Sequence, residues 1–91
     1  MSRIEITDLP SHPVGLNRLY IDRLMCEFAQ KLSQIKTNDS LTDADIALAT
    51  GLSEVFIKDV LQARRNLNAA AMSRIMFKLG YVLYLDIEPI P

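Results

Sequence analysis

The sequence has few of the residue types that build chemical sites. Its 91 residues include one cysteine, Cys26, one histidine, His12, and no tryptophan. A single cysteine cannot form a disulfide within the chain, and its place beside Met25 in a helical pattern predicts a buried thiol. A lone histidine and a lone cysteine make no plausible metal site. We therefore expect no metal and no cofactor.

The sequence also lacks the arrangements on which enzymes depend. It contains no recognisable pair of catalytic carboxylates, no nucleophile beside a base and no glycine-rich phosphate loop. Its apolar runs are short, and none approaches the ~20 residues that a membrane-spanning helix requires. Met1 to Leu9 contains charge and no long apolar core, unlike a signal peptide. These absences predict a cytoplasmic protein that is not an enzyme and does not contact a membrane.

What is present is the composition of one small folded domain. Hydrophobic residues make up 49% of the chain and charged residues 23%, a balance typical of globular domains. The apolar pattern predicts a mainly α-helical domain of four to five helices with short N- and C-terminal β-strands. The expected parts are an N-terminal arm with a strand at 3–7 (1–16), a helical core (17–80), and a C-terminal strand and tail (81–91).

Polar residues that can cap helices divide the helical core. Asn17 is a predicted N-cap for a long helix that ends near Lys36. The apolar face of this helix is expected to comprise Ile21, Leu24, Met25, Phe28, Leu32 and Ile35. Thr42, Ser53 and Asn68 are the predicted N-caps of three shorter helices, because their side-chain oxygens can accept from backbone N–H groups further along the first turn.

Residues Thr42 to Leu61 have the spacing of a helix-turn-helix motif. This motif needs a small residue where two short helices cross closely, and a turn residue that tolerates a positive φ angle. Ala47 and Gly51 meet these needs. The apolar residues expected to form the shared core of the two helices are Ile46, Leu52, Ile57 and Val60. Thr50 departs from the pattern, because an apolar residue is usual at its position.

Other helical hairpins can carry alanine, glycine and isoleucine at these distances. The identification of the motif therefore depends on the residues around it as well. Leu41 to Gly80, "LTDADIALATGLSEVFIKDVLQARRNLNAAAMSRIMFKLG", resembles the Cro/C1-type (XRE, lambda-repressor-like) helix-turn-helix family of DNA-binding domains. The ending "KLGYVLYLDIEPIP" also resembles HigA-like antitoxins, in which a strand follows the last helix. Many members of the Cro/C1 family have a phosphate-contacting glutamine at the position of Asp43, and glycine at that of Ala63. At the first of these positions, Asp43 either repels a phosphate or points away from the DNA.

In a helix-turn-helix, the N-terminal, solvent-facing residues of the second helix read bases in the major groove. The expected base-reading residues are Glu54, Val55 and Lys58. Glu54 can accept a hydrogen bond from cytosine N4, and Val55 can contact a thymine methyl group. Lys58 can donate a hydrogen bond to guanine O6 or N7. Alternatively, Glu54 only stabilises the helix dipole and Lys58 is a solvated lysine. The expected phosphate contacts, which orient the protein without reading sequence, are Ser53, Gln62, Arg64, Arg65 and Asn68.

The net charge of −1 is low for a nucleic-acid binder, although basic residues concentrate between Ser53 and Gly80. A module with so few cations binds DNA weakly at physiological salt, so we expect a homodimer on a two-fold symmetric operator. The predicted C-terminal strand leaves backbone groups unpaired. The residues expected to mediate dimerisation are Tyr81, Leu83, Leu85 and Ile87. The alternative is a ribbon formed within one chain with Arg3 to Thr7.

Three functions remain open from the sequence. The first is a double-stranded DNA-binding transcriptional regulator, and more specifically a repressor. The second is an antitoxin of similar fold, which binds a toxin protein and also regulates its own operon. The third is a protein-interaction module that has lost DNA binding, which Asp43, Glu54 and the net charge of −1 favour.

Overall fold

Four α-helices make up the computed structural model, which describes residues 14–85 and 87–90. They are α1 (Val14–Asn38), α2 (Asp43–Thr50), α3 (Glu54–Leu61) and α4 (Ala69–Lys78). The prediction of a mainly α-helical chain is therefore confirmed. The strand predicted at Arg3 to Thr7 lies outside the described residues. None of the described helices combines the length and the apolar character needed to cross a membrane.

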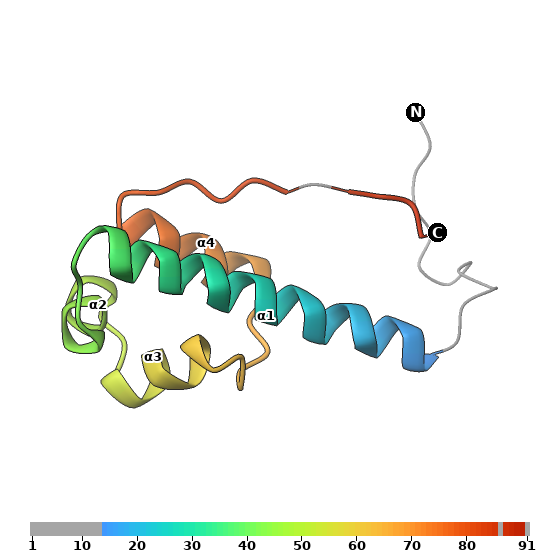
Figure 1. Cartoon of the computed structure of the whole chain (residues 1–91), viewed down its shortest axis with the longest axis horizontal. Coiled ribbons are helices and arrows are strands. Elements are labelled where there is room, and N and C mark those ends of the chain that lie inside the picture. The colour runs from blue at the N-terminus through green and yellow to red at the C-terminus, as the bar shows by residue number, and fades with distance from the viewer. Residues whose placement is uncertain (1–13, 86, 91) are drawn as a thin grey trace.

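The helix α1 is the longest of the four, and α3 packs directly against it, while α2 packs on α3 and α4. Figure 1 shows α2, α3 and α4 gathered around the C-terminal half of α1, while its N-terminal half extends beyond them. Leu24, predicted to face the core, is exposed, because it lies toward the part of α1 that the other helices do not cover. The helix begins at Val14, so Asn17 lies inside it and is not its N-cap.

Cys26 is exposed on α1, so the prediction of a buried thiol is wrong. Its neighbour Met25 occupies the core-facing position, and successive residues of an α-helix point roughly 100° apart. Phe28 and Leu32 continue the buried stripe at the spacing of three and four residues. The thiol is therefore turned away from the core by the same periodicity that buries its neighbours.

The hydrophobic core joins all four helices. Its buried residues are Met25, Phe28, Leu32 and Ile35 of α1, Ile46 of α2, Ile57 and Val60 of α3, and Met72, Ile75 and Met76 of α4. Leu32, Ile46 and Ile57 have no exposed surface. These three side chains come from α1, α2 and α3, so the centre of the core fixes α3 against both earlier helices. The opposite face of α3 is left turned outward.

The three predicted N-caps of the short helices are confirmed. The Ser53 hydroxyl accepts a hydrogen bond from the Phe56 backbone N–H at 3.0 Å, and the Asn68 side chain accepts one from Ala71 at 2.8 Å. Thr42 forms a reciprocal capping box: its hydroxyl accepts from the Asp45 N–H at 3.0 Å, and the Asp45 carboxylate accepts from the Thr42 N–H at 2.9 Å. These bonds satisfy backbone donors that the first turn of a helix leaves unpaired.

The capping box makes the stability of α2 depend on pH. Hydrogen bonds from the Thr42 backbone and hydroxyl hold the pKa of the Asp45 carboxyl below its ordinary value of 3.8. A carboxyl whose pKa is depressed by folding contributes stability above its unfolded pKa and loses that contribution as the pH falls through the folded pKa. We expect the melting temperature of the wild type to fall more steeply below about pH 4 than that of Asp45→Asn, which cannot titrate there. Circular dichroism melts between neutral and acid pH measure both profiles, and parallel profiles would contradict the expectation.

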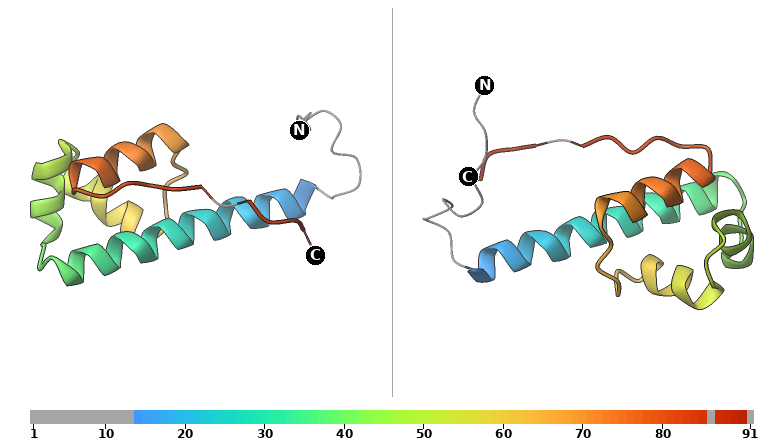
Figure 2. Two further views of the ribbon diagram at one scale, coloured as in Figure 1. Left: turned by 90° about the horizontal axis from the view of Figure 1, so that it is seen from above. Right: turned by 180° about the vertical axis from the view of Figure 1, so that it is seen from behind.

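The C-terminal segment, residues 81–85 and 87–90, contains no strand, so the strand predicted from Tyr81 to Ile87 is not present. Gly80, with a φ angle of 90°, ends the last helical turn. The Tyr81 N–H then donates to the Met76 carbonyl at 2.8 Å, and its hydroxyl donates to the Asp39 carboxylate at 2.9 Å. From this anchor the segment runs back along the bundle toward the N-terminal half of α1 (Figure 2). A strand needs a partner for its backbone groups, and the described residues contain no strand that could pair with it.

Candidate nucleic-acid interface

The pair α2 and α3 is joined by a tight connection of Gly51, Leu52 and Ser53. Gly51 has a φ angle of 75°, and its N–H donates to the Ala47 carbonyl at 2.9 Å. A left-handed backbone of this kind favours glycine, as the sequence predicted. Leu52 packs against the core cluster. The short connection turns the chain sharply from α2 into α3.

Thr50, which departed from the apolar pattern, is accommodated at the end of α2 by local hydrogen bonds. Its hydroxyl donates to the Ile46 carbonyl at 2.7 Å and accepts from the Leu52 N–H at 3.4 Å. A threonine that bonds its own preceding turn can be half-buried without leaving its hydroxyl unpaired. The polar residue therefore supports the connection between the two helices.

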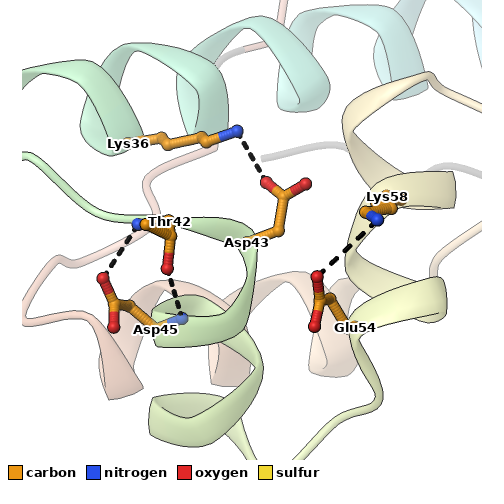
Figure 3. A network of polar contacts seen from close by, with 6 residues as sticks. All are labelled: Lys36, Thr42, Asp43, Asp45, Glu54 and Lys58. Atoms are coloured by element: carbon orange, nitrogen blue, oxygen red, sulfur yellow. Dashed lines mark hydrogen bonds and ion pairs between the residues drawn. The ribbon is translucent and has the colours of Figure 1, made fainter.

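The outward face of α3 carries all three residues predicted to read bases. Glu54, Val55 and Lys58 are exposed, and Val55 retains 68% of its accessible surface. They lie together because Ile57 and Val60 are turned into the core. The Nζ atom of Lys58 lies 3.6 Å from a carboxylate oxygen of Glu54, one helical turn earlier (Figure 3). An acceptor and a donor thus stand side by side on an otherwise open helix face.

The predicted phosphate-contacting residues flank α3 at both ends. Ser53 and Asn68 are exposed but also cap α3 and α4 with their side-chain oxygens. Capping uses an acceptor, so the Ser53 hydroxyl proton and the Asn68 amide protons remain able to donate to an anion. Gln62 and Arg64 are exposed. Arg64 has no ion-pair partner among the described residues.

Arg65 is held against α3 rather than extending freely from the loop. Its Nε atom lies 3.6 Å from a carboxylate oxygen of Asp59, and its guanidinium carbon lies 4.4 Å from the centroid of the Phe56 ring. A guanidinium over an aromatic face is attracted by the ring quadrupole. Phe56 is half-buried, and Arg65 covers part of its ring. Sequence spacing did not indicate this contact.

The loop after α3 contains a residue with a strained backbone. Ala63 has a φ angle of 57°. A left-handed backbone costs a residue with a β-carbon about 1–2 kcal/mol, and glycine escapes this cost. The alanine keeps the left-handed turn that leads toward Arg64 and Arg65.

An ion pair that the sequence did not reveal joins α1 to α2. The Nζ atom of Lys36 lies 2.6 Å from a carboxylate oxygen of Asp43, the first residue of α2 (Figure 3). Of the two side chains, 20% of the Asp43 surface and 35% of the Lys36 surface is exposed. Asp43 is therefore directed toward α1 and its charge is offset there. The two residues are separated by a polar loop, so no helical spacing marks them as neighbours.

The electrostatic character of this surface is close to neutral. Each of the cations Lys36, Lys58 and Arg65 lies beside an acidic side chain. Arg64 adds a cation, and the exposed Asp45 adds an anion. The surface offers specific donors and acceptors rather than a strong positive field. Comparisons with protein-family models, curated proteins and solved structures found no match to this chain.

Proposed function

We propose that this chain is a sequence-specific, double-stranded DNA-binding transcriptional regulator, a repressor that acts in the cytoplasm. In this proposal α2 and α3 form the helix-turn-helix, and α3 is the recognition helix. The observation that carries the proposal is the exposed N-terminal part of α3. Glu54, Val55 and Lys58 face outward there, while Ile57 and Val60 hold the helix on the core.

The chemistry of that face fits the edges of base pairs. In the major groove a lysine donates to guanine O6 or N7, a glutamate accepts from cytosine N4, and a valine contacts the thymine methyl group. Glu54 and Lys58 already form an ion pair at 3.6 Å, and docking would exchange this exposed pair for contacts to bases. Ser53, Gln62, Arg64, Arg65 and Asn68 would contact phosphates at either end of the helix.

The near-neutral surface favours a dimeric binding mode. Few free cations give a single module little electrostatic affinity, and a homodimer doubles the number of contacts. The C-terminal segment exposes Leu85 and Ile87, which retain 81% and 78% of their accessible surface. We propose that this segment, with Tyr81 and Leu83, pairs with a second copy. The dimer would bind a two-fold symmetric operator whose half-sites lie about one helical turn apart.

Selection of bound sequences from a random duplex library tests the DNA-binding function, combined with a mass measurement of the free protein. The expected result is enrichment of a two-fold symmetric sequence and a mass twice that of the chain. Failure to bind any duplex at low salt would overturn the regulator function and leave the interaction module that has lost DNA binding.

Two substitutions separate base reading from phosphate binding. Lys58→Ala is expected to relax the preference for one base pair of the selected operator, at a cost of about 1–3 kcal/mol in binding. Arg65→Ala is expected to weaken binding to all sequences about equally. Competition titrations with single-base operator variants measure both effects. If both variants kept the affinity and the base preference of the wild type, the assigned face of α3 would be incorrect.

An antitoxin that also binds a toxin protein is the second candidate, and the exposed C-terminal segment favours it. Val82, Tyr84 and Leu85 are exposed, and several exposed apolar residues together are typical of a protein-binding site. A neighbouring small gene whose product co-purifies with this chain and is neutralised by it would support this function.

A further inference from the structure

The corner where α1 leads into α2 carries a cation, Lys36, that is not among the proposed DNA-contacting residues. Lys36 lies in the last turn of α1, and its ammonium is 2.6 Å from the Asp43 carboxylate. About a third of the lysine side chain remains exposed. An ammonium group has three donors, so pairing with one carboxylate oxygen leaves donors for a second anion.

This corner borders the proposed recognition helix. α3 packs against both α1 and α2, and Ile46 of α2 meets Ile57 of α3 in the core. In Figure 3 the carboxylate of Asp43 points toward Lys36, and only 20% of the Asp43 side chain is exposed. A phosphate approaching the start of α2 would therefore meet an ammonium held in place, together with an acid whose charge is already offset.

We propose that Lys36 binds a DNA phosphate at this corner and that Asp43 is a positioning residue that holds the Lys36 ammonium there. The inference rests on the DNA-binding function proposed above. A free lysine side chain has many rotamers, and ordering it on binding costs conformational entropy. The ion pair with Asp43 restricts those rotamers before DNA arrives. The acidic residue at this position then supports phosphate binding instead of opposing it.

The salt dependence of binding tests the role of Lys36. The probe is a fluorescent mixed-sequence DNA duplex of about 20 base pairs, titrated between about 50 and 200 mM salt. Lys36→Gln is expected to reduce the slope of log affinity against log salt by about one per protomer. The matched control is Lys31→Gln, which removes the same charge roughly 140° around the same helix and should leave the slope unchanged.

The same Lys36→Gln change in an Asp43→Asn background distinguishes a phosphate contact of Lys36 from a role that is limited to neutralising the charge of Asp43. A phosphate contact predicts that the slope still falls by about one. If the slope and the affinity stayed constant in that background, Lys36 would serve only to offset Asp43 and the inference would be overturned. If the wild type bound no duplex, the DNA-binding function itself would fail, which is a distinguishable result.

The positioning role of Asp43 has its own readout. Removal of an acidic charge near DNA ordinarily raises affinity, and Asp45→Asn, two residues further along α2, is expected to do so. Asp43→Asn should raise affinity less than Asp45→Asn, because it also releases Lys36, and Asp43→Glu should keep the wild-type affinity. An equal or larger rise for Asp43→Asn would overturn the positioning role. Circular dichroism melts establish that each variant is folded at the assay temperature.

Discussion

Replacement of Ile46 by alanine is expected to lower the free energy of unfolding by about 2–5 kcal/mol. Ile46 has no exposed surface and is the buried residue of α2. It meets α1 and α3 at the centre of the core, so its loss removes apolar burial and leaves a cavity between three helices. Small domains are stable by only about 5–15 kcal/mol, so the change removes a large part of the total.

Leu48 provides a matched control for this experiment. It lies two residues further along α2, has the same number of side-chain carbon atoms and retains 86% of its accessible surface. Leu48→Ala is expected to change the free energy of unfolding by no more than about 0.5 kcal/mol. Urea unfolding followed by circular dichroism measures both variants. Equal losses at the two positions would show that α2 does not pack on the core as described.

The second large effect is expected in the C-terminal segment, where Leu85→Asn combined with Ile87→Asn should convert a dimer to a monomer. Both side chains are exposed in the single chain, so the substitutions should leave the fold stable. They change no charge, so under the proposed function they should leave the electrostatic attraction of each protomer for DNA unchanged. Linking two binding modules raises affinity by about 10²–10⁴-fold over one module. We therefore expect affinity for the two-fold operator to fall by about 100-fold or more.

Light scattering gives the mass of the variant, and fluorescence titration gives its operator affinity. Leu48→Asn is the control, since it makes the same polar substitution at an exposed position outside the segment. It should retain both the dimer mass and the affinity. A double variant that stayed dimeric would place the dimer contacts elsewhere on the chain, and a monomeric wild type would remove the dimer from the proposal.

Features set by neighbours in the chain were predicted well from the sequence. The N-caps Thr42, Ser53 and Asn68 each bond a backbone N–H three residues away, so the residue type and a short spacing were enough to find them. Gly51 was predicted for the same reason, because a positive φ angle favours one residue type. The outward direction of Glu54 and Lys58 followed from helical periodicity, once Ile57 was assigned to the core.

Features that depend on how the helices meet could not be predicted in this way. Lys36 and Asp43 are paired because the loop after α1 brings the start of α2 back toward the C-terminal end of α1. Arg65 reaches Asp59 and Phe56 because the left-handed turn at Ala63 brings it back over α3. These contacts decide which cations on this surface are already paired, and no local spacing encodes them.

The Cys26 and C-terminal predictions failed for physical reasons of the same kind. Exposure of Cys26 depends on which side of α1 the other helices cover. Apolar residues occur on more than one side of α1, so the sequence alone does not show which side is buried. The alternating pattern at Tyr81 to Ile87 describes residues that can form a strand, but a strand forms only beside a partner. The sequence by itself thus determined the four helices, the N-caps of the three short ones and the residues of the outward face of α3. Only the tertiary structure decided which cations are already paired, because ion pairs form between side chains that packing brings together.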